Sequence, residues 1–310
     1  MINIAIIGAG QLGSRHMQAM AKVKDDIILY IVDPYEQSLE ISKGRFSEVN
    51  TLAKELVCLN HIIDLPKELE FVVISTNSKQ RLGVLRELMD HAKIKYLLLE
   101  KILFPIISEY EEATRILEDT DTRTFVNCSR TMWSAYQNLK RILDTSSKVT
   151  LEVSGVNWNL GSNTIHFLNL FLYLTNEVRA TIDTSKLDNE ILANKRKGYI
   201  EFSGTLKAIT PKQHELILTS KLVGDEPVAI SIKSLNQNIE IQEAEEVIYI
   251  DGYKQVFPMH HQSNLTNKVY EQLQETGDCS LVLYKQSVEE HLMLLNAFND
   301  FLGGREGAIT

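Results

Sequence analysis

The first 125 residues alternate between short apolar runs and stretches in which apolar residues recur every three or four positions. Continuous apolar runs are typical of strands buried on both faces, and the other spacing is typical of helices. Helices are expected after Gly13 and at Tyr35–Lys43, Lys79–His91 and Glu109–Leu117. Strands are expected at Ile4–Ile7, Ile28–Asp33, Leu56–Leu59, Phe71–Thr76, Tyr96–Glu100 and Thr124–Cys128. The alternation predicts an α/β domain over residues 1–125 with a doubly wound parallel sheet.

Beyond residue 125 apolar and polar residues alternate one by one, as in an antiparallel sheet covered on one face only. Strands are expected at Lys148–Trp158, Tyr199–Phe202, Leu206–Ile209, Glu215–Thr219, Ala229–Ile232, Ile239–Ile241 and Val247–Ile250. Helices are expected at Asn163–Leu174, Asn264–Gln274 and Gln286–Phe301. Residues 126–310 are therefore expected to form an α+β domain with a large, mostly antiparallel open sheet. Because few helices are available to cover that sheet, we expect a homodimer or homotetramer.

A glycine motif, Gly8-x-Gly10-x-x-Gly13, joins the first strand to the first helix. The first glycine permits a tight turn, the second lets the backbone approach a pyrophosphate, and the third lets helix and strand pack closely. The N–H groups at the start of the helix, at Gln11 and Leu12, then face the anion. The motif predicts a dinucleotide site; a glycine turn in an unrelated α/β protein is the alternative.

Asp33 ends the second strand, 20 residues after Gly13 (33 − 13). An acid that binds the ribose hydroxyls is expected at this distance. Its carboxylate would repel the 2′-phosphate of NADP, and Pro34 follows it in place of an arginine that could bind that phosphate. The predicted cofactor is therefore NAD.

The net charge, the cysteine spacing and the apolar stretches argue against several classes of partner and site. A formal charge of −9 argues against a nucleic acid or an anionic membrane as partner, because phosphates are bound by basic surfaces. Cys58, Cys128 and Cys279 are odd in number and far apart, which suits a reducing cytoplasm and fits no metal spacing. No secretory signal is evident, and the apolar stretch Ile165–Leu174 is too short to span a bilayer. We therefore expect a cytoplasmic protein without a metal site.

Polar residues end two of the predicted parallel strands: Thr76 and Asn77 at one, and Glu100-Lys101 at the next. Because the carboxyl ends of parallel strands line the ligand crevice, Thr76, Asn77 and Glu100 are candidate cofactor ligands. Lys101 is a candidate cationic donor to the reacting oxygen, since a buried ammonium is costly unless it is paired. A simple turn and a surface lysine are the alternatives.

His166 lies on the apolar helix of the second domain. An imidazole exchanges protons with a hydroxyl at neutral pH, which makes His166 a candidate acid–base group. A core histidine bonded to a backbone carbonyl is the alternative, and the pattern taken alone favours it.

The chain resembles the family of glucose–fructose oxidoreductase and myo-inositol 2-dehydrogenase (Gfo/Idh/MocA) over nearly its whole length. The resemblance implies a Rossmann domain followed by an α/β domain with a large open sheet that often forms dimers. It implies oxidation or reduction of a sugar or cyclitol hydroxyl with NAD(H) or NADP(H). The family's Glu-Lys-Pro motif matches Glu100-Lys101 and gives Lys101 the role of catalytic lysine, although Ile102 replaces the proline. The residues that carry the resemblance are Ile4–Gly13, Val73–Asn77, Glu100-Lys101, Asn127–Arg130 and the helix with His166.

A second family motif, Asp-x-Gly-x-His-x-x-Asp, aligns with the helix around His166. The histidine is retained, but Ser162 and Asn169 stand where the motif has acids. A serine cannot act as the carboxylate of a proton relay at neutral pH. Lys101 and His166 are therefore expected to carry proton transfer, with Ser162 or Asn163 orienting the substrate hydroxyl.

Arg130 and Trp158 are candidate substrate contacts. Arg130 lies where family members cross into the second domain, and a guanidinium binds a phosphate or carboxylate with two hydrogen bonds; an interdomain salt bridge is an equal alternative. Trp158 ends a predicted strand. An aromatic side chain at this place is expected either to line a sugar pocket or to pack in the core. The sequences Asn127–Arg130, Gly161–His166 and Cys279–Tyr284 resemble those of relatives from bacterial surface-polysaccharide and nonulosonic acid pathways. This resemblance implies an amino sugar, sugar phosphate or nucleotide sugar as substrate.

The leading hypothesis is an NAD-dependent oxidoreductase that transfers hydride between nicotinamide and a secondary alcohol or ketone of a sugar derivative. Two alternatives stay open: a non-catalytic NAD-binding sensor or partner subunit, and an epimerase that recycles NAD. The acids missing at Ser162 and Asn169 favour the sensor, and the retained Lys101 and His166 oppose it.

Overall fold

The computed structural model describes residues 1–52 and 54–309, which divide into two compact units. The first unit contains residues 1–104, 108–127 and 260–284. The second contains residues 105–107, 128–259 and 285–309. The division after Asn127 lies two residues from the expected boundary at 125. His260–Tyr284, however, joins the first unit, although the sequence pattern placed it in the second domain.

The first unit is built on a seven-stranded sheet in the order β3-β2-β1-β4-β5-β6-β17. All neighbouring strands are parallel except β17, which pairs antiparallel with β6 at the edge. This is the Rossmann strand order, which reverses between β1 and β4. The predicted parallel sheet is therefore confirmed. The strands are β1 Ile2–Ile7, β2 Ile27–Val32, β3 Glu55–Leu59, β4 Glu68–Ile74, β5 Lys93–Leu99, β6 Arg123–Val126 and β17 Val282–Leu283.

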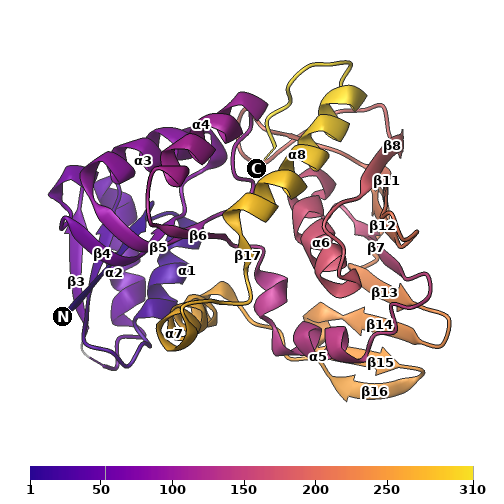
Figure 1. Cartoon of the computed structure of the whole chain (residues 1–310), viewed down its shortest axis with the longest axis horizontal. Helices are drawn as coiled ribbons and strands as arrows, with labels where there is room; N and C mark the ends of the chain where they lie inside the picture. Colours follow the sequence, from indigo (N-terminus) through magenta and orange to yellow (C-terminus); the bar gives the residue numbers. More distant parts are fainter. Residues whose placement is uncertain (53, 310) are drawn as a thin grey trace. The chain divides into compact units, whose positions relative to one another are not determined.

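Helices cover both faces of this sheet (Figure 1). Helices α3 and α4 lie on one face, and α1, α2 and α7 lie on the other. A late segment of the chain thus completes a face begun by the first helix. The helices are α1 Gln11–Met20, α2 Glu36–Ser47, α3 Ser78–His91, α4 Ile107–Glu118 and α7 Thr266–Thr276.

The second unit contains an eight-stranded sheet in the order β16-β15-β14-β13-β7-β12-β11-β8. Every neighbouring pair is antiparallel except β7 and β12, as predicted for a mostly antiparallel sheet. A separate two-stranded ribbon pairs β9 with β10. Helices α5 Ser134–Ile142, α6 Leu160–Thr175 and α8 Tyr284–Phe301 accompany the sheet. The strands are β7 Thr150–Val156, β8 Thr181–Leu187, β9 Leu192–Ala193, β10 Ile200–Glu201, β11 Gly204–Ile209, β12 Glu215–Lys221, β13 Ala229–Lys233, β14 Asn238–Gln242, β15 Val247–Ile250 and β16 Tyr253–Val256.

Helix α6 is buried around almost its whole circumference. Of its sixteen residues, only Asn163, His166 and Tyr173 are half-buried, and all the others are buried. A helix that is apolar on most sides belongs in a core. Its few polar, partly accessible side chains are therefore confined to a narrow stripe that includes His166.

The turn between β1 and α1 requires glycine at two positions for different reasons. Gly8 has φ +97°, a left-handed conformation that side chains rarely adopt. At Gly13 a Cβ atom would lie 1.8 Å from the carbonyl oxygen of Gly8 and 2.6 Å from the hydroxyl of Ser75. At Gly10 a Cβ atom would meet nothing within 4 Å. Helix and strand therefore approach closely at Gly13, and open space lies beside Gly10.

We predict that Gly13→Ala lowers the free energy of unfolding by about 3 kcal/mol, the upper end of overpacking costs, because its methyl group collides with a backbone oxygen. Gly10→Ala is the matched control and should cost about 1 kcal/mol or less, because its methyl group points into open space. Urea denaturation of the cofactor-free protein measures both values. Equal losses for the two variants would contradict the close approach at Gly13.

Candidate functional site

Asp33 holds the glycine turn through hydrogen bonds from the backbone. Its Oδ2 accepts from the Ala9 N–H at 2.8 Å, and its Oδ1 accepts from the Tyr35 N–H at 2.9 Å. Each carboxylate oxygen has a second acceptor site, so ribose hydroxyls can still bind. The structure therefore places Asp33 where the sequence spacing predicted it, at the end of β2 beside the glycine turn.

A cavity of about 590 Å³ lies at this edge of the sheet. Gly8, Asp33 and Thr76 line it together with residues from the turns after β2 and β3 and from α3. Among the described residues the buried Thr76 hydroxyl has no hydrogen-bond partner, so a polar ligand can supply one. The open space beside Gly10 and the acceptor sites of Asp33 likewise fit a pyrophosphate and a ribose. The residues present therefore fit NAD.

Three other predicted cofactor ligands lie at the starts of helices α1 and α3. Gln11 and Leu12 are the first residues of α1, and the Gln11 side-chain oxygen accepts from Arg45 at 2.9 Å. Asn77 is the N-cap of α3, and its side-chain oxygen accepts from the Gln80 N–H at 3.2 Å. The Asn77 side chain thus has a structural role in starting the helix that flanks the cavity.

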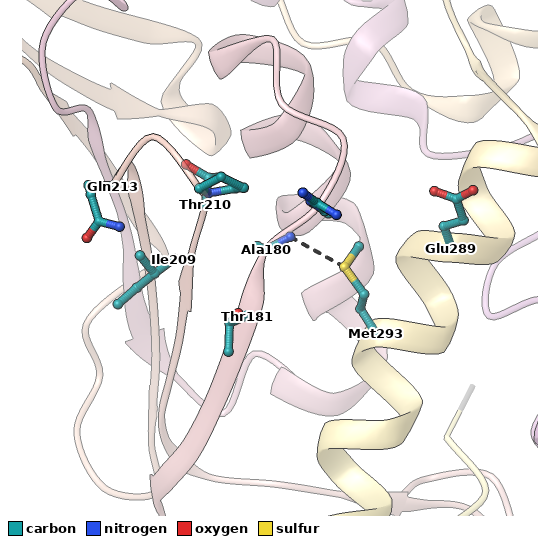
Figure 2. A pocket seen from close by; sticks show the side chains of 9 residues that line it. Ala180, Thr181, Ile209, Thr210, Gln213, Glu289 and Met293 are labelled. Atoms are coloured by element: carbon teal, nitrogen blue, oxygen red, sulfur yellow. Dashed lines mark hydrogen bonds between the residues drawn. The ribbon is translucent and has the colours of Figure 1, made fainter.

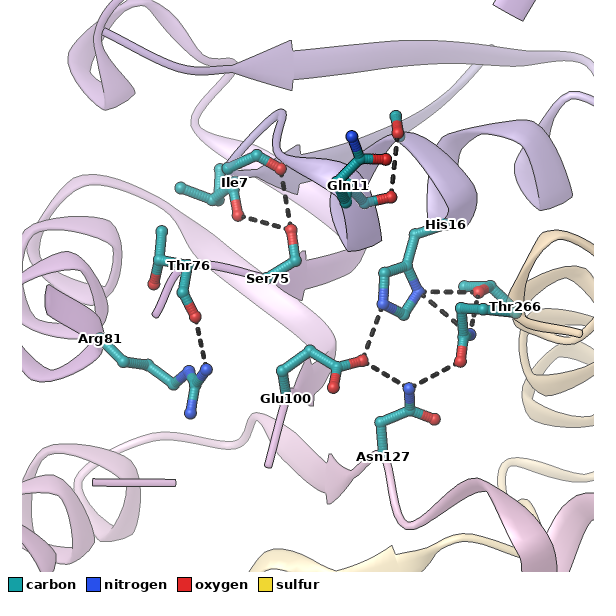
Figure 3. Close-up of polar contacts among 12 residues, drawn as sticks. Ile7, Gln11, His16, Ser75, Thr76, Arg81, Glu100, Asn127 and Thr266 are labelled. Atoms are coloured by element: carbon teal, nitrogen blue, oxygen red, sulfur yellow. Dashed lines mark hydrogen bonds and ion pairs between the residues drawn. The ribbon is translucent and has the colours of Figure 1, made fainter. Parts of the chain in front are cut away.

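The side chain of Glu100, which was predicted to bind the cofactor, lies in a buried hydrogen-bond network (Figure 3). Its carboxylate, 3% exposed, accepts from Asn127 and contacts His16 Nε2 at 2.8 Å. His16 Nδ1 contacts the Thr266 hydroxyl at 2.8 Å, and Gln262 bridges Asn127 and Thr266. Burial alone would raise the Glu100 pKa, but the hydrogen bonds from His16 and Asn127 outweigh it and hold that pKa below its usual value.

Lys101 directly follows Glu100 at the carboxyl end of β5 and is half-buried. The next residues are held by Arg81, a fully buried side chain of α3. Its guanidinium donates to the backbone carbonyls of Ile102, Leu103 (2.8 Å) and Thr76. The Lys101–Ile102 peptide bond is cis. Arg81 therefore ties the segment after Lys101 to the segment after β4.

The start of α6 contacts a carboxylate from the β9–β10 ribbon. The Ser162 hydroxyl donates to Glu201 Oε1, and the Ser162 N–H lies 3.3 Å from both carboxylate oxygens. Asn194 Nδ2 donates to the same carboxylate at 2.9 Å. The neighbouring Asn163 instead donates to the Trp158 carbonyl at 2.7 Å, which fixes the turn before the helix.

A second carboxylate meets α6 two turns further along. Asn169 Nδ2 donates to Glu290 of α8 at 2.9 Å and 3.2 Å. Glu290 is fully buried, and burial raises its pKa to about 7, against the opposing effect of hydrogen bonds from Asn169 and Gln286. Both positions where α6 lacks a family acid are thus in contact with an acid from another element.

Arg130 and Trp158 have partners within the second unit. Arg130 Nε and Nη2 each donate to Glu243 at 2.8 Å, and Tyr136 donates to the same carboxylate at 2.6 Å. The predicted alternative of a salt bridge therefore describes Arg130, but within one unit rather than between domains. The Trp158 indole donates to the Thr219 carbonyl at 2.8 Å and is 8% exposed, which makes it a packing residue.

Sequence reasoning missed Arg81, Glu201 and Glu290. Arg81 had a local signal, because it lies four residues before the apolar Leu85 and therefore on the same face of α3. Glu201 stands within an apolar strand-like run, which is unusual for an acid. Glu290 lies on the last helix and only the fold brings it to α6.

The second unit also has a cavity of about 780 Å³, shown in Figure 2. It lies between the start of β8, the turn after β11 and α8, where Met293 accepts a hydrogen bond from the Ala180 N–H. None of the residues predicted for the site lines it. This cavity is therefore distinct from the residues around His166.

Neither a metal site nor a membrane span is found in the part of the chain that the structure describes. Within residues 1–52 and 54–309, no group of three or more His, Cys, Asp or Glu side chains is arranged to hold a metal ion. Over the same ranges, no helix has the length and apolar character needed to cross a bilayer.

Solved structures of three proteins share this fold. An oxidoreductase from Agrobacterium radiobacter, solved with NAD+, L-tartaric acid and magnesium, is 16% identical, with TM-score 0.73 over 98% of this chain and 97% of its own. UDP-N-acetylglucosamine 3-dehydrogenase from Acidithiobacillus ferrooxidans is 13% identical, with TM-score 0.71 over 96% of each chain. The transcriptional regulator Gal80p from Kluyveromyces lactis is 14% identical, with TM-score 0.72 over 98% of this chain and 93% of its own.

Sequence comparison identifies a protein family that resembles the first unit. No curated protein sequence matches the chain. Residues 2–128, however, match the model of the Gfo/Idh/MocA family, described as an oxidoreductase family with an NAD-binding Rossmann fold. These residues carry the glycine turn, Asp33 and Lys101. The N-terminal part of the chain, residues 2–128, is thus similar to the Gfo/Idh/MocA family of NAD-binding oxidoreductases.

Proposed function

We propose that the protein is a cytoplasmic NAD-dependent oxidoreductase acting on the CH–OH group of a sugar derivative. The observation that carries the proposal is the NAD-binding turn with Asp33 in the same unit as Lys101, which follows β5 of the same parallel sheet. The neighbour that is a UDP-N-acetylglucosamine dehydrogenase supports an amino sugar, sugar phosphate or nucleotide sugar as substrate. When bound, NAD accepts hydride from the alcohol or NADH returns it to the ketone.

Lys101 and His166 have separate roles in this proposal. The Lys101 ammonium donates a hydrogen bond to the reacting oxygen and stabilises negative charge on it. The His166 imidazole takes the hydroxyl proton in oxidation and returns it in reduction. Ser162 and Asn163 orient the hydroxyl. The mechanism requires Lys101 and His166 to face one substrate oxygen.

A second candidate function is an NAD-binding sensor or partner subunit without catalysis. The likeness to the transcriptional regulator Gal80p supports it, as does the absence of acids at positions 162 and 169. Mixing the protein and NAD with a panel of sugar nucleotides and sugar phosphates distinguishes the two, because only the enzyme changes the absorbance of the nicotinamide. A product formed without net NADH would instead indicate an epimerase that recycles NAD.

We predict that Lys101→Met leaves NAD affinity intact but lowers turnover by about a hundred- to a thousandfold, because one electrostatic donor to the reacting oxygen is lost. Lys93→Met, at the exposed other end of β5, is the matched control and should keep wild-type turnover. Steady-state kinetics on the substrate found in the panel measure both. Unchanged turnover of Lys101→Met would leave Lys101 with a structural role only.

We predict that the protein binds NAD more tightly than NADP. Asp33→Ala should weaken NAD binding by about 1–3 kcal/mol, because a charge-assisted hydrogen bond to the ribose is lost. Asp119→Ala, an exposed change of the same kind, is the control. Calorimetric titration of NAD and NADP measures all three proteins, and equal or tighter binding of NADP to the wild type contradicts the assignment.

We predict a homodimer or homotetramer. Along β7 and β12 buried residues alternate with partly exposed ones, so one face of the sheet remains accessible to solvent. An accessible sheet face is commonly covered by a second copy in an isologous dimer. Light scattering at micromolar concentration measures the mass, and a single species of 35.3 kDa would contradict this prediction.

A further inference from the structure

Two buried carboxylates contact α6 at the two positions where the family motif has an acid and this helix does not. Glu201 contacts Ser162, four residues before His166, and Glu290 contacts Asn169, three residues after it. Residues three and four apart lie on one face of a helix. Both carboxylates are therefore held against the face of α6 that carries His166.

The contact with Glu201 is built from several elements. Glu201 comes from β10, Asn194 follows β9, and both meet the first turn of α6. A Cβ atom at Gly161 would lie 2.8 Å from Glu201 Oε2, so the carboxylate needs glycine there to reach the helix. Glu201 is 3% exposed and Ser162 is 7% exposed. The carboxylate and the Ser162 hydroxyl are therefore buried together at the first turn of the helix.

The Ser162 hydroxyl gives its only proton to Glu201. The serine oxygen accepts from Asn194 Nδ2 at 3.4 Å, and toward any further group it can act only as an acceptor. Glu201 meanwhile contacts a residue one helical turn before His166, so its negative charge favours the protonated imidazole. A serine that is hydrogen-bonded to a buried carboxylate therefore brings a negative charge to the His166 region, which a serine alone cannot do.

We propose that Glu201, acting through Ser162, is the positioning carboxylate of the His166 site and replaces the acid that family members carry on the helix. This inference rests on the proposed function. In oxidation His166 would take the hydroxyl proton of the substrate and become protonated, while bound NAD would supply the hydride acceptor and the alcohol would become a ketone. The Glu201 carboxylate stabilises that imidazole and fixes the Ser162 oxygen as an acceptor.

The test returns the carboxylate to the helix. Glu201→Gln removes the charge, and the double variant S162D/E201Q places one on α6, where the amide introduced at position 201 can donate to it. We expect E201Q to lose about ten- to a hundredfold in kcat/KM, which is part of what an acid–base group contributes. Where that loss exceeds tenfold, we expect the double variant to recover at least tenfold of it. A merely structural role of Glu201 would not be rescued by moving the charge. Glu190→Gln, an exposed change of equal charge, is the control.

A second measurement needs no substrate. NMR titration of His166, assigned with His166→Asn, should show its pKa lowered by about half a pH unit in E201Q and raised again in S162D/E201Q. Glu290, which contacts Asn169 on the same face, is unchanged in both. This titration tests the Glu201 pair even if no sugar is oxidised, a result that would overturn the proposed function alone. An unchanged His166 pKa in E201Q overturns the inference.

Ser162→Ala keeps Glu201 and separates its two effects. The charge remains, so the His166 pKa should stay within the error of the wild-type value, while KM for the sugar rises about tenfold because one hydrogen bond is lost. This variant keeps the inference testable if E201Q does not fold, which thermal unfolding and NAD affinity report. Wild-type KM in a folded S162A would overturn the role of the hydroxyl.

Discussion

A carboxylate can be buried only where donors surround it, because desolvation of an unpaired charge costs several kcal/mol. Glu100 shows how much of the first unit depends on this constraint. Its carboxylate accepts from Asn127 after β6 and contacts His16 of α1, and His16 contacts Thr266, 250 residues away in sequence. These contacts connect the ends of two neighbouring strands, β5 and β6, to the first helix and to α7. They explain why residues 260–284 belong to the first unit.

The same constraint shapes the second unit. Glu243 is satisfied by the two hydrogen bonds of Arg130 and by Tyr136, so the guanidinium that resembled an anion ligand serves the interior. Glu201 and Glu290 are satisfied by side chains of α6 and its surroundings. Each carboxylate fixes the orientation of the groups that donate to it. The polar face of α6 is therefore held by acids that come from other elements.

Local patterns were sufficient for much of the fold. Apolar strands, amphipathic helices and the spacing from Gly13 to Asp33 depend on residues close in sequence, and the structure has them. Strands β8 and β16 were missed because they are largely exposed and have no apolar alternation. The contacts of Glu201 and Glu290 join residues 39 and 121 positions apart, so no local periodicity could predict them. Glu100 was predicted as a cofactor ligand because it ends a parallel strand, and its contact with His16, 84 residues away, has no local signal.

Because Glu201 and Glu290 contact α6, the missing motif acids at positions 162 and 169 are weaker evidence against catalysis. Serine at 162 and asparagine at 169 appeared to remove two negative charges from the site, which was the main sequence argument for a protein without catalysis. In the structure both side chains are bonded to a carboxylate, so the helix has lost its own acids while its polar face still contacts two. The absent motif acids therefore distinguish an enzyme from a sensor only weakly. What distinguishes them is whether a cation acts on the substrate oxygen, the role proposed for Lys101, whose backbone segment is fixed by Arg81 and by the network of Glu100.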